Sequence, residues 1–343
     1  MTVGVAQLGF GYWGPNHARN LTTLLGQSFR YVVDAAEQRR VEAARLHPYV
    51  RVTDRLDEAL DDPRVHAVVI ATPAATHAPL ARRCLEAGKH VLVEKPLALS
   101  VTDAVEITEL AEKLNLVLMV GHTFEFVPAI RRMREYLLSG DAGDLLYLHA
   151  QRLNLGRLQR DINAFWSIGP HDVSIANYLT GASPEWVSAR GARYLSRDVE
   201  DVMFVTAGYP GGVLAHMHVS WLDPSKTRRT TLVGSRRMLV YDDLDPEGTL
   251  RIYDKGVDLL DSDAYGVWRY QMRSNGMHAP ALPAVEPLAA LLTHFLDCVR
   301  TGERPAVDGW NGVRVVAALE AVDASMRADG ARVEVCAPWG AAA

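Results

Sequence analysis

The chain has 343 residues, 48% of them hydrophobic and 22% charged, with a formal net charge of -5 at pH 7. This length exceeds the size at which single cores usually stop growing, so two domains are expected. Without a basic block, the chain lacks the clustered Lys and Arg that hold nucleic acids or membrane surfaces. No apolar run is long enough for a membrane helix, and no signal-peptide pattern opens the chain, which predicts a cytoplasmic protein.

A glycine-rich turn, GFGYWG at residues 9–14, follows an apolar run at 3–8 and precedes a helical pattern at 16–25. Such glycines make a tight turn, let the backbone approach a pyrophosphate and let helix pack on strand. The N–H groups that open the helix then face the phosphates. A second predicted strand, 30–34, ends in an acidic residue suited to the adenosine ribose. The predicted cofactor contacts here are Gly9, Gly11, Tyr12, Trp13, Gly14 and Asp34.

The acidic residue also predicts which dinucleotide is preferred. The carboxylate of Asp34 should repel a 2′-phosphate and accept hydrogen bonds from a free ribose hydroxyl. We therefore expect NAD(H) to be the preferred cofactor. NADP(H) stays open as the alternative, because Arg39 and Arg40 follow closely.

The first 123 residues alternate strand and helix patterns. Further strands are expected at 49–53, 65–71, 90–93 and 116–120, with helices at 78–87 and 100–114. Continuous apolar strands that alternate with helices indicate a parallel sheet covered on both faces. Residues 1–123 are therefore predicted to form an α/β, doubly wound dinucleotide-binding domain.

The pattern changes beyond this point. A helix is expected at 127–138, and residues 213–221 alternate polar and apolar side chains, as in a sheet with two different faces. Helices at 286–300 and 311–326 close the chain. We predict an α+β domain over 124–343 with a large, mostly antiparallel sheet. Its amphipathic sheet offers a face for self-association, which predicts a homo-oligomer, a dimer or a tetramer.

Several ordered motifs together resemble the glucose-fructose oxidoreductase/inositol dehydrogenase (Gfo/Idh/MocA) family. The segment at 152–156 and the Phe165-Trp166 pair look most similar to sugar-nucleotide oxidoreductases. The resemblance implies NAD(P)-dependent hydride transfer at a secondary alcohol or ketone of a sugar, in a site between the two domains. The matching motifs are the 9–14 turn, ATP at 71–73 with Thr76-His77, EKP at 94–96, GHTF at 121–124, GPHD at 169–172, SWLDP at 220–224 and EPL at 286–288.

Two residues are predicted to carry the chemistry. Oxidation of an alcohol needs a base for the hydroxyl proton and a cation beside the developing alkoxide. Lys95 follows the fifth strand, at the sheet edge where ligands bind, and Pro96 fixes its backbone direction. His171 is the predicted proton carrier, since its ordinary pKa lies near neutrality. It is expected to start a helix over 171–179, whose dipole would favour the neutral ring.

Ser167 departs from the family pattern. Relatives commonly carry an aspartate four residues before the histidine, where this chain has serine. The departure leaves open what orients His171. Asp172 could substitute for the missing carboxylate or could help to cap the helix.

The remaining site predictions follow from the resemblance. Arginines suit a carboxylate or diphosphate because their donors form a planar fork; a solvated surface role for Arg157 is an equal alternative. His216 and His218 share one strand face without a third ligand, so we predict sheet packing and no metal site. Further cofactor contacts are Thr72, Pro73, His77, Glu94 and Lys95, and the predicted substrate contacts are Lys95, His122, Arg152, Asn154, Arg157, Ser167, His171 and Asp172.

The sequence thus predicts an NAD(P)-dependent sugar or sugar-nucleotide oxidoreductase with a small-molecule substrate. A dehydrogenase of inositol or another free polyol is the nearer alternative. A sensor that binds a dinucleotide without turnover is the second alternative, and Ser167 is the feature that supports it.

Overall fold

A computed structural model describes residues 3–156, 158–159, 161–195, 197–246, 248–260, 269–336 and 338. These residues form two compact units. The first runs to Phe126 and includes 285–317, and the second comprises Val127–Ala284 and Ala318–Cys336.

The first unit is built on a six-stranded parallel sheet. Its order is β3 (Arg51–Thr53), β2 (Phe29–Val33), β1 (Val5–Leu8), β4 (Ala67–Ile70), β5 (His90–Val93) and β6 (Leu118–Val120). Every neighbouring pair is parallel, and β1 and β4 are buried throughout. This is the strand order of a doubly wound dinucleotide-binding fold, as predicted.

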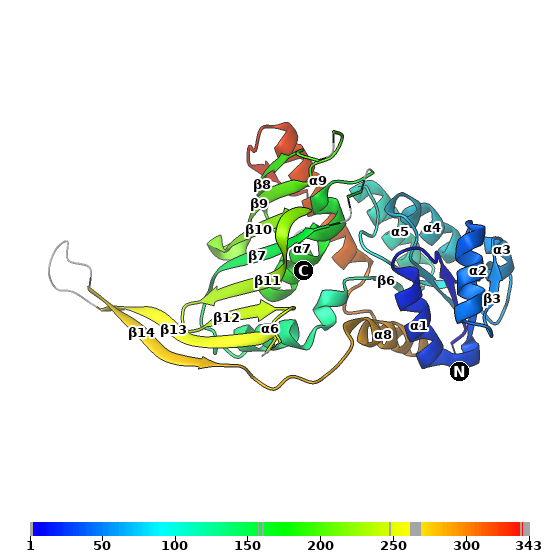
Figure 1. Cartoon of the computed structure of the whole chain (residues 1–343), viewed down its shortest axis with the longest axis horizontal. Coiled ribbons are helices and arrows are strands. Elements are labelled where there is room, and N and C mark those ends of the chain that lie inside the picture. Colours follow the sequence, from blue (N-terminus) through cyan, green and yellow to red (C-terminus); the bar gives the residue numbers. More distant parts are fainter. Residues whose placement is uncertain are drawn as a thin grey trace. The chain divides into compact units, whose positions relative to one another are not determined.

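The helices of this unit follow the predicted alternation closely. The strands and helices up to β6 run from blue to cyan in Figure 1. Ser100 caps helix α5 (Val101–Lys113) by accepting a hydrogen bond from the Asp103 N–H, as the spacing of these two residues indicates. The helices are α1 (Gly14–Leu25), α2 (Glu37–Leu46), α3 (Leu56–Leu60), α4 (His77–Glu86) and α5 (Val101–Lys113).

Helix α8 (Pro287–Thr301) belongs to this first unit, although it lies far along the chain. Its residues Leu291 and Phe295 are fully buried in one cluster with Phe10 and Leu21 of the dinucleotide domain. The units therefore differ from the predicted limits of 1–123 and 124–343. The reason is physical: an amphipathic helix shows that it needs a core, but its sequence does not say which core receives it.

The second unit contains a nine-stranded sheet. All neighbouring strands are antiparallel except β7 and β10, which are parallel. The predicted large, mostly antiparallel sheet is thus confirmed. The order is β14 (Arg269–His278), β13 (Leu250–Leu260), β12 (Met238–Asp242), β11 (Leu222–Gly234), β7 (Leu145–Leu155), β10 (Leu214–Ser220), β9 (Val202–Gly208), β8 (Trp186–Ala192) and β15 (Val333–Glu334).

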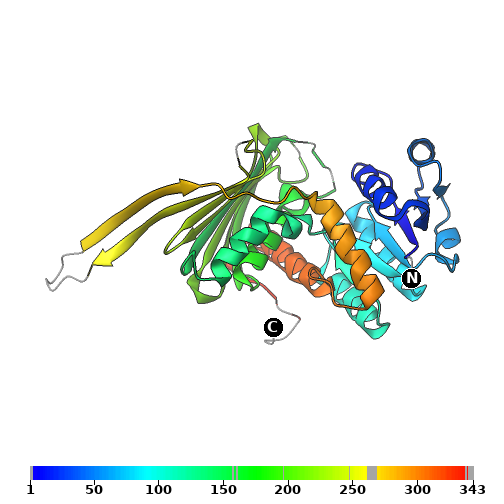
Figure 2. The same ribbon diagram turned by 90° about the horizontal axis from the view of Figure 1, so that it is seen from below.

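Helices cover one face of this sheet. Helices α6 (Pro128–Leu138) and α7 (Ala164–Thr180) pack on it, as Figure 2 shows. Along β10, Ala215, Met217 and Val219 are buried while Leu214 and His216 are exposed, which gives the predicted two-faced alternation. Helix α9 (Gly309–Arg327) begins in the first unit and ends in the second.

None of the helices in the described ranges is both long enough and apolar enough to cross a lipid bilayer.

Candidate active site

The glycine turn after β1 contains two glycines that pack closely against the protein backbone and one that faces open space. Gly9 has φ of 90°, and a Cβ there would stand 2.5 Å from the Ala71 carbonyl oxygen. A Cβ on Gly14 would stand 2.6 Å from the Gly9 oxygen. Around Gly11, by contrast, no atom of the described residues beyond its two chain neighbours lies within 4 Å of where a Cβ would stand. The turn therefore leaves its middle glycine open, which fits the close approach of a dinucleotide pyrophosphate.

Gln7 braces the same turn from inside the sheet. Its buried Nε2 donates to the carbonyl oxygens of Gly9 at 2.8 Å and Gly14 at 2.9 Å. One amide group thus fixes both ends of the turn. Gln7 was not predicted, although a polar side chain within an otherwise apolar strand was the available signal.

Asp34 lies directly after β2 with its carboxylate fixed. One oxygen accepts from the Phe10 N–H at 2.6 Å and the other from the Ala36 N–H at 2.8 Å. Arg39 pairs with Glu42 instead. Arg40 donates to the backbone carbonyls of residues 34 and 35 and pairs with Asp54. Two backbone N–H groups therefore orient the Asp34 carboxylate beside the glycine turn.

Glu94 and Lys95 follow β5 at the same carboxyl edge of the sheet. The buried Glu94 carboxylate accepts from His17 Nε2 at 2.7 Å and from the Lys95 N–H at 3.2 Å. Burial raises the pKa of Glu94, but the His17 hydrogen bond and the charge of Lys95 outweigh it and hold that pKa below its usual range. His17 of α1 was not predicted, and its place three residues after Gly14 was the signal for it.

Two further predicted histidines lie in this region of the first unit. Burial lowers the pKa of His122 to about 4, so its ring is neutral at pH 7. Among the described residues, neither ring nitrogen of His122 has a hydrogen-bond partner. Such an orphaned polar group points to a ligand. His77 instead contacts the backbone of Thr72 and Pro96.

In the second unit, α7 carries His171, but not where the sequence placed it. The helix begins at Ala164, because the Asn163 side chain accepts from the Trp166 N–H at 2.9 Å and caps it. The expectation that His171 starts a helix and feels its dipole is therefore wrong. Pro170, just before the predicted start, lies inside the helix.

Asp172 neither caps the helix nor stands free. It is 2% exposed and accepts from Arg152 of β7, with 2.8 Å between Nη2 and Oδ1. The pair buries two opposite charges that satisfy each other. Part of the Arg152 guanidinium is therefore bonded to Asp172 within the protein.

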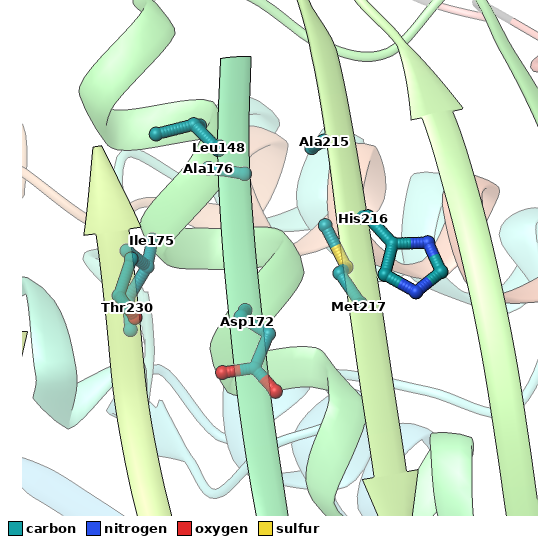
Figure 3. A pocket seen from close by; sticks show the side chains of 9 residues that line it. Leu148, Asp172, Ile175, Ala176, Ala215, His216, Met217 and Thr230 are labelled. Carbon is teal, nitrogen blue, oxygen red and sulfur yellow. The ribbon is translucent and has the colours of Figure 1, made fainter. Parts of the chain in front are cut away.

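A small cavity near this pair is not a ligand site. Figure 3 shows Asp172, Ile175 and Ala176 of α7 facing side chains of the sheet. The cavity measures about 10 Å³, room for about one water molecule and far below the roughly 300–1,000 Å³ of small-molecule sites. It marks imperfect packing under the sheet.

Ser167 and Asn154 are the remaining described substrate candidates. Ser167 Oγ accepts from Gln159 Nε2 at 3.0 Å and lies four residues before His171, on the same helix face. Asn154 Oδ1 is buried and has no hydrogen-bond partner in the described part of the chain. Arg157 lies outside the described residues.

The paired histidines of β10 contact neighbouring rings. His216 stacks on His149 at 5.7 Å between ring centroids, and His218 stacks on Phe204 at 4.3 Å. Within the described ranges, no group of three or more His, Cys, Asp or Glu side chains could hold a metal ion.

Comparison with known proteins defines the class of protein. Residues 3–122 match the model of the oxidoreductase family with an NAD-binding Rossmann fold, and residues 130–240 match the Gfo/Idh/MocA C-terminal domain. The chain belongs to the Gfo/Idh/MocA oxidoreductases. The predicted class, a nicotinamide-dependent oxidoreductase of the sugar-dehydrogenase type, is thereby confirmed.

Individual relatives carry more specific names. Inositol 2-dehydrogenase 2 of Saccharopolyspora erythraea is 33% identical over 64% of this chain and 67% of its own. UDP-N-acetylglucosamine 3-dehydrogenase of Acidithiobacillus ferrooxidans is 28% identical over 96% of this chain and 98% of its own. Among solved structures, GenD2 from gentamicin A biosynthesis, in complex with NAD, is 29% identical, has a TM-score of 0.81 and covers 98% of this chain and 97% of its own.

The glycine turn generates a prediction that separates folding from binding. Gly11→Ala should leave the melting temperature nearly unchanged, because its Cβ would meet no atom of the described residues beyond its chain neighbours. The same methyl group should weaken NAD(H) binding by tenfold or more by blocking the pyrophosphate. Gly14→Ala is the matched control and should lower the melting temperature, because its Cβ overlaps the Gly9 carbonyl. Thermal melts and NAD(H) titration of both variants measure this, and unchanged affinity in Gly11→Ala would contradict it.

Proposed function

We propose that the protein transfers hydride between NAD(H) and a secondary alcohol or ketone of a nucleotide-linked sugar. The observation that carries this proposal is the carboxyl edge of the parallel sheet. Open Gly11, the braced carboxylate of Asp34 and Lys95 follow β1, β2 and β5 there. Ligands of such sheets bind outside the carboxyl ends of the strands.

The dinucleotide and two side chains share the chemistry. When bound, the nicotinamide accepts or returns the hydride. The Lys95 ammonium stabilises negative charge on the substrate oxygen as the carbonyl forms. His171 takes the hydroxyl proton in oxidation and returns it in reduction. His122 and Asn154 contribute hydrogen bonds to the ligands, because each holds a buried polar atom without a described protein partner.

The substrate class is supported by the extent of one resemblance. The UDP-N-acetylglucosamine 3-dehydrogenase match spans nearly the whole of both chains, whereas the inositol 2-dehydrogenase 2 match spans about two thirds. A free polyol such as inositol is the second candidate, supported by the higher identity of that shorter match. Native mass spectrometry of the purified protein, with copurified dinucleotide and sugar ligand, distinguishes the two.

We further propose that the protein works in the cytoplasm as a homo-oligomer. The face of the nine-stranded sheet opposite its helices supports self-association. It exposes large apolar side chains, including Tyr147, Phe204 and Leu214, and exposed apolar patches often mark interfaces.

The cofactor preference tests the role of Asp34. We expect NAD(H) to bind at least tenfold more tightly than NADP(H), about 1.4 kcal/mol, because the fixed carboxylate repels a 2′-phosphate. Asp34→Asn should shrink this ratio, whereas Asp61→Asn, after α3, should not. Fluorescence titration with both dinucleotides measures the ratio. Tighter binding of NADP(H) by tenfold would overturn the assignment.

The catalytic roles make a second prediction. Lys95→Ala and His171→Ala should still bind NAD(H) but should lose roughly 10²–10⁴-fold in turnover. Lys113→Ala, at the end of α5, serves as the control and should behave as the parent enzyme. Steady-state kinetics beside NAD(H) titration separate the two effects. Near-parental turnover in both variants would favour a dinucleotide sensor.

Ser167 supplies a third prediction. A carboxylate at this position would lie one helical turn from His171 and would favour the imidazolium. Ser167→Asp should therefore move the acidic limb of the kcat/KM profile for alcohol oxidation to higher pH, since that limb reports protonation of the base. Ser167→Asn is the neutral control and should leave the limb in place. An unmoved limb in an active, folded Ser167→Asp enzyme would mean that the two residues are not electrostatically coupled, or that His171 is not the base.

A further inference from the structure

We propose that His77 is held as an imidazolium that ties the Thr72 segment to the Lys95-Pro96 segment, and so acts as a positioning residue for Lys95. The charge state of the His77 ring does not depend on the proposed function and can be tested without a ligand. The positioning role rests on the proposed function, because it matters only if Lys95 acts in turnover.

The contacts of the ring carry the proposal. His77 is the first residue of α4 and is 1% exposed. Its Nδ1 lies 2.7 Å from the Pro96 carbonyl oxygen, and its Nε2 lies 2.9 Å from the Thr72 carbonyl oxygen. A carbonyl oxygen only accepts hydrogen bonds, and both ring nitrogens are donors only in the imidazolium. A neutral ring would press a lone pair against one of the two oxygens.

Other histidines of the same unit show the opposite arrangement. His66 and His90 each accept a backbone N–H at Nδ1, from Gly4 at 3.0 Å and from Val117 at 2.9 Å. These two nitrogens must be unprotonated to accept, so both rings are neutral. His66 and His90 therefore serve as neutral histidines in the same unit with which His77 can be compared.

The surroundings of Glu94 support a positive charge on His77. His17 donates one hydrogen bond to Glu94 at 2.7 Å. The charges of His17, Lys95 and His77 all lower the pKa of that carboxyl. The Glu94 carboxylate in return favours the protonated ring of His77.

Burial is the opposing effect. It lowers the pKa of His77, and the charge of Lys95 lowers it further. The Pro96 and Thr72 carbonyls and Glu94 raise the same pKa, but by less, so burial leaves the pKa of His77 below its usual value. We give the contacts the greater weight, because a buried carbonyl at hydrogen-bond distance from a bare nitrogen would be left unsatisfied.

The position of the two carbonyls explains the consequence for the site. Thr72 follows β4, and Pro96 follows Lys95 beyond β5, so the ring joins the ends of two adjacent strands. Holding the carbonyl next to Lys95 restricts where that residue can place its ammonium. A small displacement of a catalytic group can cost on the order of 10²-fold in rate.

Nitrogen NMR of the full-length protein labelled with ¹⁵N-histidine tests the charge state without any ligand. At pH 7 we expect both ring nitrogens of His77 to carry protons, and one bare nitrogen in each of His66 and His90. The substitutions His77→Gln, His66→Gln and His90→Gln assign the signals. A bare nitrogen on His77 at pH 7 would overturn the proposal.

Kinetics test the positioning role. His77→Gln can donate to only one of the two carbonyls at a time, so we expect kcat to fall on the order of 10²-fold while Lys95 is intact. His90→Gln, which can still accept from Val117, should keep kcat. Parental kcat in a folded His77→Gln enzyme would overturn the positioning role. If the parent shows no turnover with any sugar, the proposed function fails, and the NMR result still decides the charge of His77.

Discussion

The first unit depends on one buried carboxylate. Glu94 ends up inside the protein because Val93 completes β5 immediately before it, and an isolated charge there would be costly. The His17 hydrogen bond and the neighbouring Lys95 make that burial tolerable. His17 lies on the helix that starts at the glycine turn, so the His17–Glu94 pair connects the glycine turn to the segment that carries Lys95. Substitution of either His17 or Glu94 would therefore disturb both the glycine turn and the segment that carries Lys95.

Much of the first unit could be predicted because its signals are local. A buried parallel strand is a continuous apolar run, and a glycine with positive φ, such as Gly9, is required by its own backbone. The acidic residue at the end of β2 was found by its spacing from the turn. Gln7 and His17 were missed because their partners are defined only when strand, turn and helix are assembled.

The second unit was less predictable because its key choices are not local. The start of α7 depends on Asn163, whose side chain caps the helix and also donates to Asp323 of α9. Asp323 additionally accepts from the Trp166 indole at 2.7 Å. Before the fold is known, Asn163 is not distinguished as a cap, and the predicted helix start at His171 is seven residues too late.

The Arg152–Asp172 pair decides what Ser167 means for the chemistry. Asp172 was the residue that could have replaced the carboxylate missing at Ser167, but its charge is already satisfied by a buried guanidinium. The position one turn before His171 holds a hydroxyl bonded to a neutral amide, Gln159. Neither group adds a free negative charge to this stretch of α7. A proton carrier in such surroundings is not biased towards its charged form by its own helix, which suits a base that must begin alcohol oxidation neutral.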